Sequence, residues 1–272
     1  MSDVLVSAHW LEARLGDPSL RVLEASIAKE SYDEAHIPGA LWVDHFADLL
    51  RNGDETSGEV LGPEQFAALM RRLGIAAQTT VVWYGDRHSS YAIRGLWTMA
   101  FYRHPAPVHV LDGGRERWIA EGRAVTAEVP RIAPAEYPPP AAIDDRDRAT
   151  WQQVRDAIDD PGAVVLDVRS LDEYEGRTVR AAHAGHIPGA AHIEWTDATA
   201  GDNVLKSPAE LRAMYEAAGV TPDKRVIAHC QLGIRAAHTW FVLKHVLGYP
   251  DVRNYDGSWQ EWGNRNDLPA EL

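Results

Sequence analysis

The sequence is poor in cysteine, with Cys230 the only one among 272 residues. One thiol cannot form a disulfide within the chain, which excludes a disulfide-stapled fold and fits a reducing compartment. Long apolar runs are also missing, since no stretch approaches the roughly 18 uninterrupted apolar residues that a membrane span needs. The first 16 residues lack the basic-then-apolar layout of a secretory signal. We therefore expect a soluble, cytoplasmic protein.

Positive charge is scarce as well. The sequence has 27 Lys and Arg against 40 Asp and Glu, which gives a formal net charge of −13. Such a chain on average repels phosphate backbones and anionic membrane surfaces. We therefore expect neither nucleic acid nor membrane among its partners.

What the sequence does contain is an internal repeat. Ala-His-Ile-Pro-Gly-Ala at 35–40 returns as Gly-His-Ile-Pro-Gly-Ala at 185–190, and the offset is 143 from Leu23 to Leu166 and 150 from His36 to His186. A length of 272 residues suits two domains of roughly 100 to 150 residues each. A proline-rich stretch, with Glu-Tyr-Pro-Pro-Pro at 136–140, separates the copies. We predict domains at 1–123 and 149–272 joined by a linker at 124–148.

Each copy alternates helical and strand patterns. Ser7 and Thr150 are expected to cap a first helix in the two copies. Fully apolar strands are expected at 80–84 and 225–229, and strands that are apolar on both faces are typical of a parallel sheet covered by helices on both sides. The sequence therefore predicts an α/β fold for each half.

Features shared by both copies are expected to serve folding, and features of one copy are candidates for chemistry. His183 and His186 have a spacing that a metal site can use. However, His36 stands before the same Ile-Pro-Gly-Ala in the other copy. This repetition favours a structural turn histidine, and we expect no metal.

The thiol is the clearest difference between the copies. Cys230 directly follows the apolar strand 225–229, whereas Gly85 stands at the matching place after 80–84. A lone cysteine is more often a small buried hydrophobe than a nucleophile. In open α/β sheets, however, ligands bind at the carboxyl ends of the strands, and Gly233 permits a tight loop there. The position of Cys230 therefore indicates an active site.

The loop after Cys230 has a specific chemistry. Backbone N–H groups that have left the strand converge on one point, and the helix that follows adds about half a positive charge there. Such a loop stabilises the thiolate, the reactive form of cysteine, and the outer sulfur of a persulfide. We assign the loop, with Arg235 adding positive charge, to substrate binding through Gln231, Leu232, Gly233, Ile234 and Arg235.

Four motifs in a fixed order carry a family resemblance. They are Cys-x-x-x-x-Arg after a buried strand, the Gly-His-Ile-Pro-Gly-Ala box, the strand end 166–170 and Gly-Ser-Trp-Gln-Glu-Trp-Gly at 257–263. Together they resemble the tandem-domain rhodaneses, which are thiosulfate sulfurtransferases, over almost the whole chain. The resemblance implies two rhodanese-like domains, each a parallel five-stranded sheet with helices on both faces. It also implies that only the C-terminal domain is catalytic and that no cofactor is needed.

The resemblance also implies a mechanism. The Cys230 thiolate attacks the outer sulfur of thiosulfate, releases sulfite, and passes the persulfide sulfur to cyanide in an assay or to a cellular thiol. The expected partners are small sulfur anions and thiol acceptors, with a protein sulfur acceptor as a further possibility. In the N-terminal copy, our hypothesis is that Asp86 fills an inactive loop with its own carboxylate.

Further residues are assigned to the pocket or its surroundings. Asp167 and Arg169 are expected to form an ion pair that either orders the floor of the site or is purely structural. Trp195 is a candidate pocket wall, with a place in the core as the alternative reading.

The loop also departs from the thiosulfate enzymes that it resembles. Those enzymes carry basic residues where this chain has Gln231, Leu232 or Glu173. Arg177 or Arg180 is the candidate to compensate for the missing charge.

Three alternatives stay open. Mercaptopyruvate sulfurtransferases carry Cys-Gly-Ser-Gly in this loop, and Leu232 lacks the serine hydroxyl, so that donor is disfavoured. Phosphatases and arsenate reductases use Cys-x5-Arg, one residue longer than the loop from Cys230 to Arg235. A sulfur-relay or binding module that hands sulfur to a protein partner is the third.

Overall fold

The computed structural model describes residues 4–200 and 204–272, which form two compact units. Among these residues, unit 1 holds 4–53, 60–144 and 204, and unit 2 holds 54–59, 145–200 and 205–272. The stretch 54–59 therefore belongs to unit 2 although it lies within the first half of the sequence. Most of the predicted linker, up to residue 144, clusters with unit 1.

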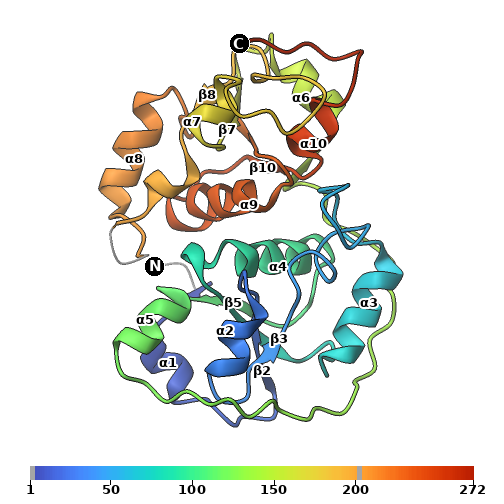
Figure 1. Cartoon of the computed structure of the whole chain (residues 1–272), viewed down its shortest axis with the longest axis vertical. Helices are drawn as coiled ribbons and strands as arrows, with labels where there is room; N and C mark the ends of the chain where they lie inside the picture. Colours follow the sequence, from blue (N-terminus) through green and yellow to red (C-terminus); the bar gives the residue numbers. More distant parts are fainter. Residues whose placement is uncertain (1–3, 201–203) are drawn as a thin grey trace. The chain divides into compact units, whose positions relative to one another are not determined.

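Unit 1 is built on one parallel five-stranded sheet with the order β1-β5-β4-β2-β3. The strands are β1 (Leu5–Val6), β2 (Leu20–Glu24), β3 (Leu41–Trp42), β4 (Thr80–Tyr84) and β5 (Val108–Leu111). The helices are α1 (Ala8–Glu12), α2 (Lys29–Glu34), α3 (Pro63–Arg72), α4 (Ser90–Phe101) and α5 (Gly114–Ala120), with a 3-10 turn η1 (Arg87–Ser89) before α4. The helices cover both faces of the sheet (Figure 1).

Unit 2 repeats this architecture with the order β6-β10-β9-β7-β8. The strands are β6 (Arg148–Ala149), β7 (Ala163–Asp167), β8 (Ala191–His192), β9 (Arg225–His229) and β10 (Val252–Tyr255). The helices are α6 (Trp151–Ala157), α7 (Leu171–Tyr174), α8 (Pro208–Ala217), α9 (Ile234–Phe241) and α10 (Ser258–Trp262), with η2 (Trp195–Ala198) and a π-helical turn η3 (Val242–Val246). The predicted fold class is confirmed in both halves.

Local signals in the sequence account for where these elements begin. The Ser7 hydroxyl accepts the Trp10 N–H at 3.2 Å, and Thr150 opens α6 in the same way, so both predicted helix caps are confirmed. The strands predicted at 80–84 and 225–229 have those bounds in the structure. In the described part of the chain, no helix combines the length and apolar character that crossing a bilayer requires.

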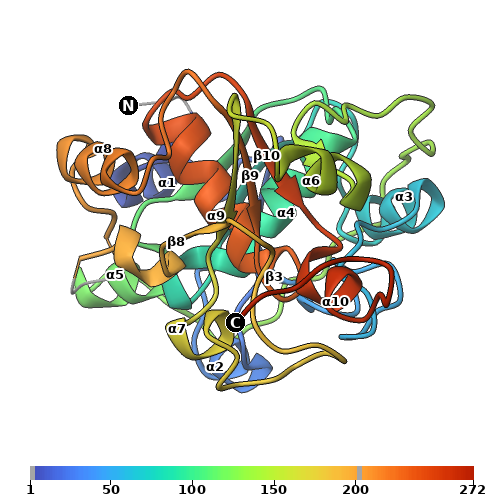
Figure 2. The same cartoon turned by 90° about the horizontal axis from the view of Figure 1, so that it is seen from above.

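Both faces of the unit 2 sheet are buried, as the apolar strand predicts. On one face, Ile227 of β9 packs in a core with Trp259 and Trp262 of α10 and Val154 of α6. On the other face, α9 lies along β9 and β10 (Figure 2). The end of β9 is therefore held from both sides, which makes it a rigid place from which to present a side chain.

The repeated histidines have the same surroundings in both units. The His36 ring stacks on Tyr32 at 3.9 Å between ring centroids and donates to the Tyr32 carbonyl oxygen. His186 stacks on Tyr174 at 3.7 Å and donates to the Tyr174 carbonyl oxygen. These contacts fix the turn that follows α2 and α7, which is a structural role.

Candidate active site

Cys230 lies where β9 ends, and α9 begins four residues later. Gly233, with φ of +70°, makes the left-handed turn between them that a residue with a side chain adopts only with strain. The Cys230 N–H donates to the Ser258 hydroxyl at 3.1 Å, and its carbonyl oxygen accepts the Trp259 N–H at 2.9 Å. The start of α10 therefore anchors the cysteine backbone.

The loop amides that follow are open. Within residues 4–200 and 204–272, no acceptor is bound to the backbone N–H groups of Gln231, Leu232, Ile234 and Arg235. The first hydrogen bond of α9 runs from the Ala237 N–H to the Gly233 carbonyl oxygen at 3.2 Å. Open N–H groups at the start of a helix favour an anion. The loop is therefore an anion cradle directly after the thiol.

Two amide side chains hold this loop in place. The Gln231 Nε2 donates to the Arg180 carbonyl oxygen at 3.2 Å and to the Gln260 Oε1 at 3.0 Å. The Asn254 Nδ2 donates to the Gly233 carbonyl oxygen at 3.0 Å. Because the Gln231 side chain is buried in these contacts, the loop offers its backbone to a ligand.

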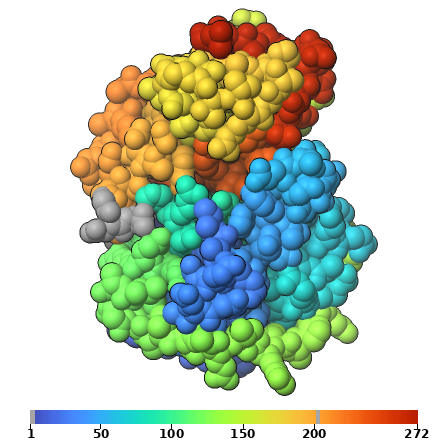
Figure 3. All heavy atoms as spheres, viewed as in Figure 1, coloured from blue at the N-terminus to red at the C-terminus, as the bar shows by residue number. Residues whose placement is uncertain are grey.

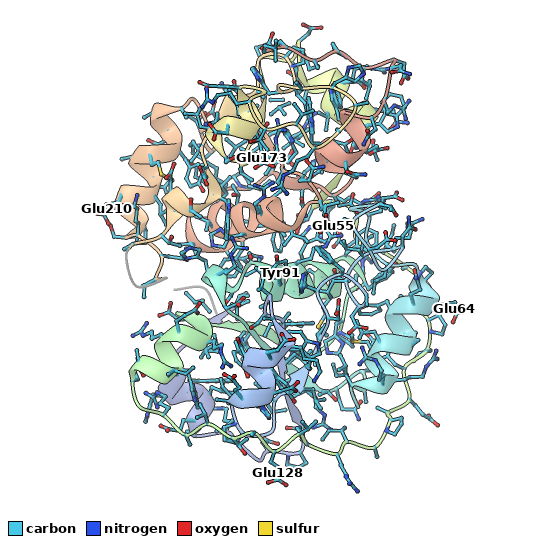
Figure 4. All side chains as sticks on the ribbon, in the orientation of Figure 1. Glu55, Glu64, Tyr91, Glu128, Glu173 and Glu210 are labelled. Atoms are coloured by element: carbon cyan, nitrogen blue, oxygen red, sulfur yellow. The ribbon has the colours of Figure 1, made fainter. Side chains whose placement is uncertain are left out.

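Arg235 lies in an ion pair. Its guanidinium donates two hydrogen bonds to the Glu173 carboxylate, at 2.7 and 3.0 Å, and Glu173 lies inside unit 2 (Figure 4). Burial alone raises the pKa of Glu173, but the Arg235 bonds and the Ser170 cap outweigh it and bring the pKa to about 2. Glu173 is therefore ionised at neutral pH. Its negative charge compensates the positive charge that Arg235 was expected to add to the loop.

Arg235 is also within electrostatic reach of the thiol. Burial alone lowers its pKa, yet the pKa is raised because Glu173 accepts its hydrogen bonds and the charge of the Cys230 sulfur attracts it. The two residues therefore interact electrostatically within unit 2. The role of each in binding stays a prediction.

A buried ion pair lies beside the strand end that carries Cys230. The Asp167 and Arg169 side chains meet at 2.5 Å, as predicted, and the Arg169 guanidinium lies 4.4 Å from the Trp259 ring centroid. His229 Nε2 lies 3.5 Å from the Asp167 carboxylate. Burial lowers the pKa of His229 to about 4, although Asp167 opposes this shift, so His229 is neutral at pH 7. Whether this pair orders the site floor stays a prediction.

Two candidates remain, Arg177 and Trp195. Arg177 is exposed and pairs with Asp172 and Glu175, so no contact of this residue reaches the loop in the described part of the chain. The yellow segment around α7 that includes it forms part of the surface in Figure 3. Trp195 is buried, with its ring 5.4 Å from that of His238 on α9. Both assignments stay predictions.

The matching loop of unit 1 corrects our hypothesis for Asp86. The Asp86 carboxylate accepts hydrogen bonds from the Ile27 N–H, at 3.1 and 3.2 Å, instead of filling its own loop. Burial raises the pKa of Asp86, and the Ile27 bond opposes this rise. The Asp86 N–H is bound to the Ser26 hydroxyl at 3.1 Å, so the backbone and the side chain of Asp86 both bind the segment that follows β2.

Some functional contacts escaped the sequence analysis. Ser258 accepts the Cys230 N–H although it needs a φ of +52°, a conformation that favours glycine. The sequence does indicate this conformation, because the repeat places Gly114 at the same position in unit 1. In the sequence, Glu173 only marks a place where the thiosulfate enzymes carry a basic residue. Its partner, Arg235, lies 62 positions further along the chain. No sequence pattern indicated that pairing.

Comparisons with known proteins agree with the tandem fold. The family model described as "Rhodanese-like domain" matches residues 7–121 and 150–265. The "Sulfur carrier protein TtuD" of Thermus thermophilus is 43% identical, over 98% of this chain and 96% of that protein. The "Thiosulfate sulfurtransferase" of Corynebacterium glutamicum is 40% identical, over 98% of this chain and 90% of that protein.

Solved structures are similar over the whole chain as well. The anaerobic ergothioneine biosynthesis enzyme from Chlorobium limicola, in complex with trimethyl histidine, matches with a TM-score of 0.84 at 26% identity, over 98% of this chain and 70% of that one. A variant of EanB with ergothioneine covalently linked with a persulfide cysteine matches with a TM-score of 0.86 at 25% identity, over the same shares of the two chains. Both similarities span the two units.

Proposed function

Because the chain belongs to the rhodanese family of sulfurtransferases and sulfur carriers, we propose that it moves sulfane sulfur from thiosulfate to a thiophilic acceptor through a persulfide on Cys230. Cyanide serves as the acceptor in an assay, and a thiol serves as the acceptor in the cell. The single free cysteine fits a reducing compartment, and we place the protein in the cytoplasm.

The observation that carries this proposal is the set of open N–H groups around the thiol. The amides of Gln231, Leu232, Ile234 and Arg235 have no acceptor among the described residues. They favour the thiolate of Cys230 before transfer and the terminal sulfur of the persulfide after it. Because the same donors serve both states, the loop need not rearrange between the two half-reactions.

The reaction divides into two displacements. The Cys230 thiolate attacks the outer sulfur of thiosulfate, a new S–S bond forms, and sulfite leaves with the electron pair of the broken S–S bond. The acceptor then attacks the outer persulfide sulfur, which returns the Cys230 thiolate and yields thiocyanate when the acceptor is cyanide. Backbone donors stabilise the charge on sulfur in each step.

Intact-mass measurement tests this directly. Wild type and Cys230→Ser are incubated with thiosulfate and then with cyanide. We expect wild type alone to gain the mass of one sulfur atom and to lose it to cyanide with release of thiocyanate. If the serine variant gains the same mass, Cys230 is not the sulfur acceptor.

A sulfur-carrier role is the second candidate, and one comparison favours it. The Thermus thermophilus relative named as a sulfur carrier is 43% identical over 98% of this chain. In that role, the Cys230 persulfide passes to a protein thiol and turnover with cyanide is incidental. A persulfide that survives small thiols but disappears on mixing with a partner protein would favour the carrier role.

Mercaptopyruvate is the alternative donor. Leu232 stands where the enzymes for that donor have a serine hydroxyl, so we expect little sulfur loading from it. Loading by mercaptopyruvate in the absence of loading by thiosulfate would reverse this assignment.

A further inference from the structure

The buried charges around the cradle cancel in pairs. Arg235 is bound to Glu173 by two hydrogen bonds, and the Glu173 side chain is 4% exposed. Arg169 is bound to Asp167 in the same way, and both side chains are almost fully buried. The guanidinium of each pair is therefore matched by one ionised carboxylate. The pairs leave no net charge beside the thiol.

The other groups near the loop add little positive charge. His229 is neutral at pH 7 because burial lowers its pKa to about 4. Leu232 and Gln231 are uncharged where a cation would lie closest to a substrate. The Arg180 guanidinium is more than half exposed, and its Nε is 3.6 Å from the same Glu173 carboxylate. Arg180 shares the Glu173 charge with Arg235 and is screened by solvent, so the attraction for an anion rests mainly on backbone N–H groups.

This arrangement distinguishes donors by their charge. Backbone N–H groups can stabilise one charged sulfur atom, but thiosulfate brings a second charge on its sulfonate oxygens, and the chain as a whole carries −13. A hydropersulfide, R–S–SH, delivers the same sulfane sulfur without that second charge. Donors that stabilise one charged sulfur atom therefore suit a hydropersulfide better than thiosulfate.

We infer that Glu173 sets the charge of the sulfur donor, because by neutralising Arg235 it makes the cradle favour a hydropersulfide over dianionic thiosulfate. Thiosulfate remains a donor, but a slow one. This inference rests on the proposed function, since it concerns how sulfur reaches Cys230. Glu173 acts here through Arg235 and is a positioning residue.

The transfer from a hydropersulfide balances without a further reagent. The Cys230 thiolate attacks the outer sulfur of R–S–SH, the bond between the two donor sulfurs breaks, and R–S⁻ leaves with its electron pair. The proton of the transferred S–H moves to R–S⁻. The products are the Cys230 persulfide anion and R–SH, and the sulfane sulfur keeps its oxidation state.

The test compares two donors in single-turnover loading of Cys230, followed by intact mass. The donors are thiosulfate and cysteine persulfide, and the variants are Glu173→Gln and the control Glu175→Gln. The control removes the same charge two residues away, from a carboxylate that is 42% exposed and pairs with Arg177. It therefore reports the effect of net charge alone.

We expect Glu173→Gln to raise the second-order rate with thiosulfate about tenfold, because Arg235 and the more exposed Arg180 then lose the carboxylate that they share and attract the dianion. The rate with cysteine persulfide should rise by less than about threefold, and Glu175→Gln should change both rates by less than about twofold. Arg235→Gln should have the opposite effect and slow thiosulfate at least about tenfold, because it leaves the Glu173 charge with only the longer, more exposed contact to Arg180. Equal effects of Glu173→Gln and Glu175→Gln would overturn the inference.

Wild type provides a measurement that needs no variant. If no free cation attracts thiosulfate, its loading rate should rise as ionic strength increases, because salt screens the repulsion by the acidic protein. A rate that falls with salt would overturn the inference. Loading by neither donor would reject the proposed function itself, whereas loading by both with thiosulfate faster would reject only the role of Glu173.

Discussion

The loops after β4 and β9 occupy the same place in two copies of one fold, and they differ most in the state of their backbone amides. In unit 1, the Asp86 N–H binds the Ser26 hydroxyl, and the Arg87 N–H binds the Glu116 carboxylate at 3.0 Å. In unit 2, the equivalent amides of Gln231 and Leu232 have no acceptor among the described residues. The unit 1 loop therefore lacks both the thiol and the open donors that a thiolate needs.

The backbone conformations differ as well. Arg87, His88 and Ser89 all have φ between 47° and 58°, whereas in the unit 2 loop the left-handed turn falls on Gly233. A Cβ on Gly85 would lie 2.1 Å from the Ala25 carbonyl oxygen. Unit 1 therefore has no room for a cysteine at the place that matches Cys230.

The largest expected effect comes from moving the thiol to unit 1. Cys230→Ser should lose all sulfur loading, and Cys230→Ser with Gly85→Cys should stay unloaded, because the new side chain clashes with Ala25 and meets occupied amides. Intact mass after thiosulfate measures this. Sulfur loading of the double variant would mean that a thiol at this strand end is sufficient, without open backbone N–H groups.

An effect of intermediate size is expected on the free energy of unfolding. It concerns the residue before the loop, which is His229 in unit 2 and Tyr84 in unit 1. Burial lowers the pKa of His229 from 6.5 to about 4. Because the unfolded state then binds more protons in this window, the stabilisation is full above pH 6.5 and is lost as pH falls towards 4. The loss should be on the order of 3 kcal/mol, measured by urea unfolding at each pH.

His229→Leu removes this titration and should reduce the slope of the free energy of unfolding between pH 6.5 and 4 by about half, because burial also lowers the pKa of His245 to about 4. The exposed His9→Leu serves as the control and should keep the wild-type slope. Equal slopes for wild type and His229→Leu would show that His229 does not carry the pH dependence.

The smallest expected effect is that of Asp86→Asn. Its carboxylate binds the Ile27 N–H in unit 1 and contributes nothing to the cradle around Cys230, and asparagine keeps an oxygen for the same bond. Turnover with thiosulfate and cyanide should change by less than about twofold. A large loss of turnover would show that the unit 1 loop contributes to catalysis.

The repeat made most of this fold predictable from the sequence. The apolar strands 80–84 and 225–229 and the caps at Ser7 and Thr150 are local signals, and each element starts where its signal lies. The position of Cys230 at a strand end was predictable because its copy, Gly85, gave an internal control.

Contacts between distant residues were not predictable in this way. Glu173 and Arg235 are far apart in the sequence, and only the fold brings the end of α7 to the start of α9. The prediction that Asp86 fills its own loop was wrong because it considered one segment, whereas the N–H of Ile27, in the segment after β2, binds the same carboxylate. Short edge strands such as β3 and β8, with two residues each, carry no periodic signal of their own.

The stretch 54–59 lies in the first half of the sequence but belongs to unit 2, which limits how the two halves can be separated. A Cβ on Gly58 would lie 2.2 Å from the Asp256 carbonyl oxygen and 2.8 Å from the Leu232 backbone, so this stretch packs directly against the loop that follows Cys230. The residues on both sides of it belong to unit 1. A gene cut at its midpoint would therefore encode a second half that lacks a piece of its own unit. Deleting the copy without a thiol would therefore also remove residues 54–59 from the unit that carries Cys230.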